Sequence, residues 1–143
     1  MLRSIVAILA GVVVLTVASF AIEAAVDPLL LRVFPEALPN ADALSSNTWA
    51  RTLTFAYGFL SVAAGGYVAA RLARRSPVAH ATVMGIVQAG LTVVAMLSPA
   101  ASHASPVQWI AIAILSILSA AVGGVLCRRS VVERPPAHAS AVS

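Results

Sequence analysis

Residues 52–70 read Thr-Leu-Thr-Phe-Ala-Tyr-Gly-Phe-Leu-Ser-Val-Ala-Ala-Gly-Gly-Tyr-Val-Ala-Ala, and this run carries no charged side chain between Arg51 and Arg71. A helix needs about 20 mainly apolar residues to cross the hydrocarbon core of a bilayer. The run does not alternate apolar with polar residues, as a strand of a membrane barrel does. It therefore predicts a transmembrane helix, whose backbone groups hydrogen-bond within the helix and need no water.

Three further runs have the same character. They cover residues 4–22, 79–98 and 107–127. Of the 143 residues, 60% are hydrophobic and 10% are charged, whereas about 25% are charged in a typical soluble domain. A soluble domain of this length would lack the polar surface to cover so many apolar side chains. The predicted fold class is an all-α integral membrane bundle of four transmembrane helices, forming one domain over residues 1–129.

The first run also has features of a secretory signal peptide, because Arg3 precedes it and small residues lie near its end. However, the uncharged stretch is longer than the usual signal core of about 7–15 residues. No clear small-x-small cleavage site precedes a polar segment. We therefore favour a retained helix over a cleaved signal.

The arginines predict how the bundle is oriented. With the N-terminus in the cytoplasm, only Arg32 and Arg51 of the nine basic residues lie outside. The residues on the inside are Arg3, Arg71, Arg74, Arg75, Arg128, Arg129 and Arg134. Cytoplasmic loops carry such an excess of basic residues, so both termini are predicted to be cytoplasmic, an N-in/C-in topology. The lipid headgroups are then expected to contact Arg71, Arg74, Arg75, Arg128 and Arg129.

All the basic residues are arginine, which we interpret as the coding bias of a GC-rich bacterial genome. The predicted location is the bacterial cytoplasmic (inner) membrane. A sequence pI near 10.7 would also suit a nucleic-acid-binding protein. The arginines sit at the ends of apolar runs, however, where they serve as membrane anchors, so no nucleic-acid partner is predicted.

Two segments outside the spans are distinctive. Residues 23–51 are predicted to form a long outer loop, with three prolines and the apolar stretch 29–34. That stretch either lies on the outer membrane interface as a short amphipathic segment or packs as a cap on the bundle. Residues 130–143 are rich in Pro, Ala and Ser and are predicted to be a disordered cytoplasmic tail.

Small residues at helical spacing are the clearest motif inside the spans. Lipid gives helices no hydrophobic drive to associate, so close backbone contact at small side chains holds them together. The predicted packing residues are Gly58, Ser61, Gly65, Gly66, Ala69, Gly85, Ala120, Gly123 and Gly124. They serve contacts inside one bundle, or one stripe of them faces another subunit.

Polar side chains are scarce inside the predicted spans. The spans hold no Asp, Glu, Lys or Arg, which argues against an ion-coupled transporter. Glu23 directly follows the first span and is expected to be solvated at the outer headgroups. Gln88 is the most polar side chain within a span. It is expected to form an interhelical hydrogen bond worth about 0.6–2 kcal/mol, with contact to a ligand as the alternative.

The sequence contains no pattern typical of an enzyme. It has no nucleophile–base pair, no glycine-rich phosphate loop and no metal-ligand cluster. The single cysteine, Cys127, can form no intramolecular disulfide, and the three histidines are predicted to lie in separate places. We therefore predict no enzymatic activity, no cofactor and no metal.

Part of the chain resembles a family of small uncharacterised bacterial four-helix membrane proteins. The matching residues are Gly65-Gly66-Tyr67-Val68-Ala69-Ala70-Arg71, then Arg74-Arg75, then His80-Ala81 and Gly85. In that family a helix ends in Gly-Gly-Tyr-x-Ala-Ala, a basic turn follows, and the next helix opens with His-Ala and a nearby Gly. The resemblance implies the same architecture and implies no activity, cofactor or catalytic residue.

Two functions are consistent with these features. The first is a non-enzymatic subunit, assembly factor or scaffold that acts through helix packing. The alternative is a small-molecule carrier of the four-helix size class, for which a polar cavity at Gln88 would be the distinguishing feature. The predicted partners are the lipid bilayer and either a second copy of the chain or a larger membrane complex.

Reporter fusions test the predicted topology. A reporter placed after Ser143 should show a cytoplasmic C-terminus, and one inserted near Asn40 should show the outer side, because the basic residues cluster at the other ends of the helices. A C-terminus on the outer side would mean that a helix has been miscounted or that the first one is cleaved.

Overall fold

A computed structural model describes residues 2–73, 76–97 and 106–132, and those residues contain helices and no β-strand. The helices are α1 (Leu2–Val33), α2 (Ala41–Ser46), α3 (Thr48–Ala73), α4 (Pro77–Met96) and α5 (Pro106–Val132). All except α2 are long and apolar enough to cross a membrane. The predicted all-helical chain with four membrane-length helices is confirmed.

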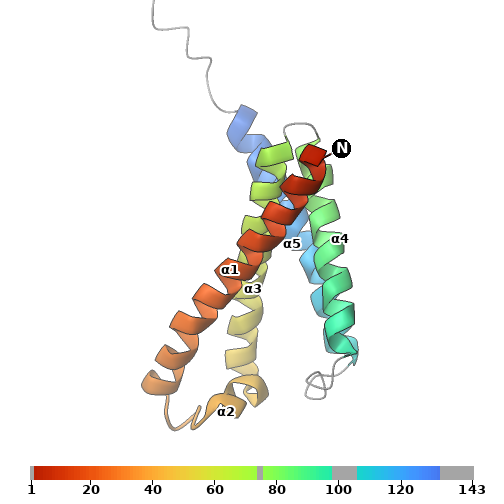
Figure 1. Cartoon of the computed structure of the whole chain (residues 1–143). Helices are drawn as coiled ribbons and strands as arrows, with labels where there is room; N and C mark the ends of the chain where they lie inside the picture. The colour runs from red at the N-terminus through yellow and green to blue at the C-terminus, as the bar shows by residue number, and fades with distance from the viewer. Residues whose placement is uncertain (1, 74–75, 98–105, 133–143) are drawn as a thin grey trace, which may run out of the picture.

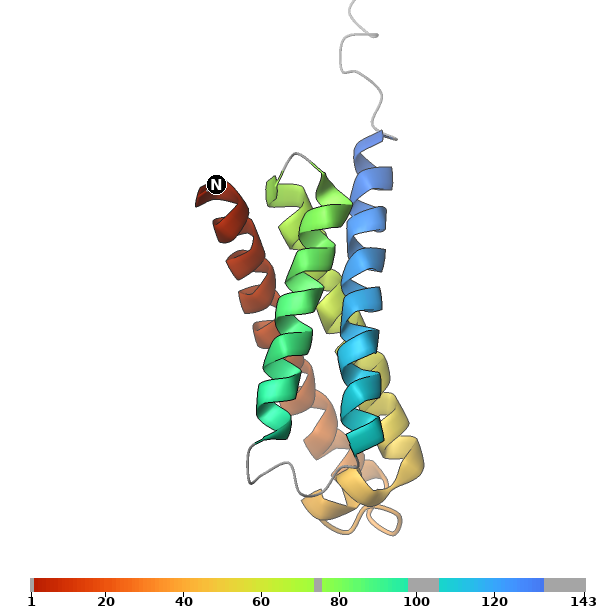
Figure 2. The same ribbon diagram turned by 90° about the vertical axis from the view of Figure 1, so that its right-hand side faces the viewer.

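The four long helices form a bundle in which α3 is central. It packs against α1, α4 and α5, and α4 and α5 also pack along each other. Figure 1 shows that α1 crosses the bundle obliquely and diverges from it toward α2. The chain runs alternately up and down, so the start of α1 and the end of α5 lie at the same end of the bundle (Figure 2). We call this the N-terminal end, and the opposite one the α2 end.

The first helix is longer than predicted. It was expected to end at residue 22, but α1 continues through Glu23, Asp27 and Pro28 to Val33. Proline removes one backbone donor from a helix, and membrane helices tolerate this where neighbouring groups compensate. With 32 residues α1 is about 48 Å long, well beyond the roughly 30 Å of hydrocarbon. Its excess length fits its inclination in Figure 1.

The remainder of the expected loop is also ordered. Asn40 caps α2 by accepting a hydrogen bond from the Ala43 amide at 3.0 Å. Leu38 is only 1% exposed, and the rings of Phe34 and Trp49 meet edge to face with centroids 5.3 Å apart. The stretch 29–34 forms the last turns of α1 and the residue after them, and Leu38 is the apolar residue buried in the loop.

Pairs of glycines bring backbones into contact at the N-terminal end. A Cβ added at Gly65 of α3 would lie 2.6 Å from the carbonyl oxygen of Gly11 of α1, and one at Gly11 would lie 2.8 Å from that of Gly65. Gly66 approaches the Ala120 backbone of α5 in the same way, and Gly123 approaches that of Ala63. Only glycine allows helices to approach this closely.

Further glycines join α4 to α5. A Cβ at Gly85 would lie 2.9 Å from the Ile117 Cα, and one at Gly124 would lie 3.0 Å from the Val78 Cα. The completely buried side chain of Met84 reaches from α4 to the junction of the other helices, where its flexible thioether fills the space. Other small residues named from the sequence are also buried, namely Ser61, Ala69 and Ala120.

Gly58 differs from the other glycines predicted to pack helices. A Cβ at Gly58 would meet nothing within 4 Å, and the same holds for Gly90. Both lie in the half of the bundle nearer the α2 end, where α3 and its neighbours have moved apart. The six glycines at helix contacts all lie in the other half, so the bundle is tight at its N-terminal end and looser at its α2 end.

Some predictions fall on residues that the structure does not describe. Arg74 and Arg75 lie outside the described residues, as do Ser98 and His103. The predicted tail was to begin at residue 130, but α5 extends to Val132, and residues 133–143 lie outside the description.

Enlarging a glycine at a helix contact should destabilise the bundle. Gly65→Leu and Gly66→Leu should each lower the free energy of unfolding by about 3 kcal/mol or more, because the new side chain forces backbones apart. Leu60→Ala should cost far less, since Leu60 is 64% exposed and faces away from the bundle. Unfolding of the purified protein in detergent measures the difference. Equal tolerance at all three sites would contradict the packing described here.

Candidate functional site

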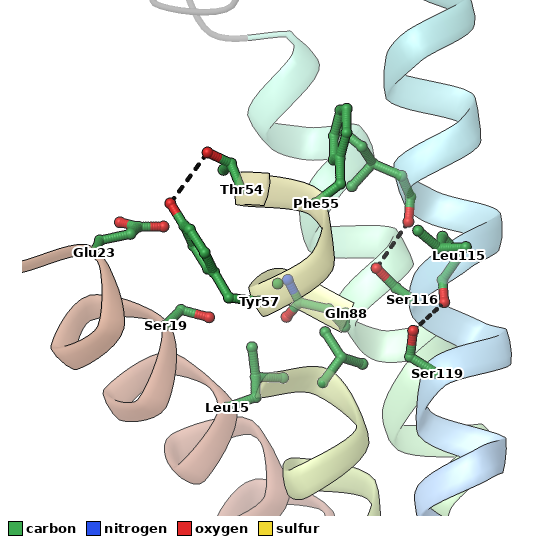
Figure 3. A pocket seen from close by; sticks show the side chains of 13 residues that line it. Leu15, Ser19, Glu23, Thr54, Phe55, Tyr57, Gln88, Leu115, Ser116 and Ser119 are labelled. Atoms are coloured by element: carbon green, nitrogen blue, oxygen red, sulfur yellow. Dashed lines mark hydrogen bonds between the residues drawn. The ribbon is translucent and has the colours of Figure 1, made fainter. Parts of the chain in front are cut away.

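A cavity of about 230 Å³ lies between all four long helices, on the α2 side of the glycine contacts. Figure 3 shows its walls, with α1 on one side, α3 in the middle and α5 on the other side. Leu15 and Val62 close it toward the buried core that surrounds Met84. The cavity therefore begins where the glycine contacts end.

The α1 wall carries a carboxylate. Leu15, Ser19 and Glu23 follow one another at four-residue spacing, so they share one face of the helix, and all three line the cavity. Glu23 is half-buried, and its side chain is directed toward Tyr57 of α3 (Figure 3). This corrects the expectation that Glu23 lies at a helix end: α1 continues for more than two further turns, so Glu23 is an internal residue of the helix.

Tyr57 connects the α1 and α3 walls. Its ring is buried, with 7% of its surface exposed. The hydroxyl donates to Thr54 Oγ1 at 3.2 Å or, in a longer contact of 3.5 Å, to Asp27 Oδ1. Asp27 lies one turn beyond Glu23 on α1. Tyr57 thus lies beside two carboxylates, one of which lines the cavity.

Hydroxyl groups from α3 and α5 complete the polar lining. Ser116 donates to the Ile112 carbonyl at 2.9 Å, and Ser119 donates to the Leu115 carbonyl at 2.6 Å. Thr54 donates in the same way to the carbonyl of Ala50 at 3.2 Å. A hydroxyl has one hydrogen, so each of these groups has only acceptor lone pairs left for the cavity.

Gln88 supplies the polar side chain from α4. It is half-buried and lines the cavity, with its amide drawn between the α1 and α5 walls in Figure 3. Within the described part of the chain, the Gln88 side chain makes no hydrogen bond, so the expected interhelical bond is absent there. Its amide retains both a donor and an acceptor for a ligand or water.

A separate polar group lies at the N-terminal end. Arg71 donates to the Tyr67 hydroxyl at 3.2 Å, and this hydroxyl also bonds to Ser130 Oγ at 3.2 Å. Arg71 is exposed, as are Arg128 and Arg129. These three described arginines lie at the N-terminal end, far from the cavity, and their contact with lipid headgroups stays a prediction.

The side chains that line the cavity are able to bind a small molecule noncovalently. In the described ranges, no group of three or more His, Cys, Asp or Glu side chains is placed to hold a metal ion. Cys127 is buried against Ala70 and Ala81 at the other end of the bundle. The cavity offers a carboxylate, hydroxyl acceptors, one amide and aromatic and aliphatic walls, which together suit a small polar molecule.

Comparisons with known proteins identify no relative. No family model matches the chain, no curated protein matches it, and no solved structure matches it. The resemblance drawn from the residues between Gly65 and Gly85 therefore stays a prediction.

Cysteine labelling tests whether the cavity admits water. With Cys127 replaced by Ala, Ser19→Cys should react with a charged, membrane-impermeant thiol reagent, because the thiolate that reacts forms only where water reaches it. Val17→Cys should remain unreactive, since Val17 lies two residues away on the exposed apolar side of α1. Mass spectrometry of the labelled protein gives both rates. Equal labelling at the two positions would contradict a water-accessible cavity on this face of α1.

Proposed function

We propose that this protein is a non-enzymatic carrier that binds a small polar molecule in the cavity between its four helices. The observation that carries the proposal is the polar lining of a cavity between four helices of membrane-spanning length, with Glu23, Gln88 and hydroxyls from three helices. Of the two functions left open by the sequence, a scaffold needs no such space. A carrier needs a binding site of this kind near the middle of its helices.

The cost of an unfilled polar cavity supports this choice. Polar groups in an apolar environment cost free energy unless they are hydrogen-bonded. The Gln88 amide and the Glu23 carboxylate have no hydrogen-bond partner among the described side chains, so a ligand or water must supply one. A bundle evolved only for packing would fill this space with an apolar side chain, and Gly58 leaves it open instead.

The asymmetry of the bundle also fits a carrier. Backbone contacts close the N-terminal end, and the cavity lies in the looser half toward α2. Alternating access requires a site that is closed on one side while it is open on the other. We propose that the structure corresponds to the state open toward the α2 end.

The charges at the two ends support a location and an orientation. We propose a bacterial cytoplasmic membrane with both termini inside. In the described residues, Arg3, Arg71, Arg128 and Arg129 lie at the N-terminal end, and Arg32 and Arg51 lie at the α2 end. Basic residues favour the cytoplasmic side, so the cavity half would face outward.

A scaffold that acts through helix packing is the second candidate, and the position of α1 favours it. Only 17% of the most apolar window of α1 is buried, compared with 28–39% for the other three long helices. An outer helix of this kind would gain contacts in a homo-oligomer or a larger complex. Lipid covers such a face equally well, so we place this candidate second.

A pair of glycine variants separates the two functions. Gly58→Leu should abolish ligand binding without destabilising the bundle, because the new side chain enters the cavity and meets no atom at its Cβ. Gly90→Leu is the matched control, since its Cβ also meets nothing and Gly90 does not line the cavity. Equilibrium dialysis of the protein in nanodiscs against propylammonium, propionamide and propionate measures binding.

The wild-type protein and Gly90→Leu should retain at least one of the three compounds, and Gly58→Leu should retain none. Retention by Gly58→Leu at the wild-type level would show that the cavity is not the binding site. No retention by the wild-type protein, with Gly58→Leu and Gly90→Leu both as stable as wild type, would favour the scaffold.

A further inference from the structure

We propose that the cavity selects a small primary ammonium cation, with Glu23 as its counter-ion. This inference rests on the proposed function, because it specifies the class of molecule that the cavity would carry. Three features of the described residues support it: the sign of the charge in the wall, the excess of hydrogen-bond acceptors and the size of the space.

The charge of the wall is negative. Among the described residues that line the cavity, Glu23 is the one charged side chain, and the charge of another carboxylate, Asp27, acts on it from one turn further along α1. Arg32 and Arg51 lie at the same end of the bundle, yet neither forms an ion pair with Glu23 in the described part of the chain. A half-buried carboxylate between helices of membrane-spanning length, without a basic partner, favours a cation that approaches it.

The polar lining accepts hydrogen bonds more readily than it donates them. Ser116, Ser119 and Thr54 donate their hydroxyl hydrogens to backbone carbonyls, so toward a ligand these groups can act only as acceptors; one lone pair of Thr54 already accepts the Tyr57 hydroxyl. The backbone amides of the helices are engaged within the helices and offer no donors to an anion. A primary ammonium group has three donors and no acceptor, so it complements this wall.

The aromatic side chains of the cavity are also compatible with a cation. Tyr57 lies beside Glu23, and Phe55 lines the same cavity farther from α1 (Figure 3). The face of an aromatic ring attracts a cation, and the attraction grows when both are shielded from water. We place the ammonium group between Glu23 and Tyr57, with the rest of the ligand directed toward Gln88 and the α5 hydroxyls.

The size of the cavity limits the rest of the molecule. The volume of about 230 Å³ leaves room for a small molecule. It lies below the roughly 300–1,000 Å³ of cavities that hold drug-sized ligands. The cavity therefore suits a small cation better than a drug-sized one.

Titration of binding tests the inference with the full chain in nanodiscs. Isothermal calorimetry at constant ionic strength would use propylammonium, with tetramethylammonium, propionamide, propionate and sodium ion as comparison compounds. Propylammonium should bind most tightly, because it alone combines the charge with three N–H donors and a short chain. Glu23→Gln should weaken its binding at least about tenfold, since a charged hydrogen bond is replaced by a neutral one.

Glu36→Gln is the matched control, because Glu36 is an exposed carboxylate at the same end of the bundle and lies outside the cavity. It should bind propylammonium as the wild-type protein does. Thermal unfolding of each variant shows whether the bundle is intact. If Glu23→Gln fails to fold, the wild-type protein tests the same charge preference. Its affinity for propylammonium should exceed its affinity for propionamide by more than about tenfold.

The outcomes separate this inference from the proposed function. Tighter binding of propionamide, propionate or sodium ion, abolished by Gly58→Leu, would overturn the ammonium assignment and leave the carrier standing. Unchanged propylammonium affinity in Glu23→Gln would also overturn it. Binding of none of the compounds to the wild-type protein would overturn both.

Discussion

The backbones of α1 and α3 meet at Gly11 and Gly65, and the rest of the bundle depends on this contact and on those beside it. In lipid, apolar side chains gain nothing by leaving one apolar environment for another. Helices associate where small residues let backbones approach, and here Gly66 and Gly123 bring α5 against α3 directly next to the α1 contact. Met84 from α4 fills the remaining space, so four helices are joined at one level.

Because the helices are joined near the N-terminal end of the bundle, their packing is looser toward the α2 end. Helices that touch at a crossing and are inclined to each other move apart with distance from it. Toward α2, Gly58 no longer contacts a neighbouring helix, because a Cβ added there would meet no atom within 4 Å. The side chains at this level line a cavity. The same contacts that close the N-terminal half thus leave a space beside Glu23 and Gln88 in the other half (Figure 3).

The cavity gives a role to residues that packing alone does not explain. Glu23 would be costly at membrane depth without a partner, and Tyr57 positions its hydroxyl between α1 and Thr54. Serine hydroxyls that donate to their own helix leave acceptors in the wall. These features support the proposed binding of a donor-rich ligand, and they coexist with close helix contacts at small residues toward the opposite end.

Some of this was predictable from the sequence. Uncharged runs indicate membrane helices because each span must satisfy its backbone internally, so the four long helices were found. The end of α1 is not evident from the sequence, because an acidic residue and a proline such as Glu23 and Pro28 are typical of a loop, whereas the helix continues past both to Val33. The four-residue spacing of Leu15, Ser19 and Glu23 is enough to predict that they share one face of a helix.

What the sequence lacked was the angle at which the helices cross. Gly58 and Gly65 both lie among small residues at helical spacing in α3, so the sequence does not distinguish them. Their distance from the point where α1 crosses α3 decides which one contacts a neighbouring helix. The cavity depends on that angle too, because its walls come from four helices that are remote in the chain. Gln88 could be identified as an isolated polar residue, but its position beside Glu23 could not.

Amide hydrogen exchange of the protein in lipid nanodiscs tests the central claim most directly. If the bundle is closed at the N-terminal end and open toward α2, peptides that cover residues 61–70 and 119–127 should exchange at least about tenfold more slowly than peptides that cover 52–58 and 110–116. Uniform protection along α3 and α5 would contradict a bundle that is tight in one half and holds a water-accessible cavity in the other.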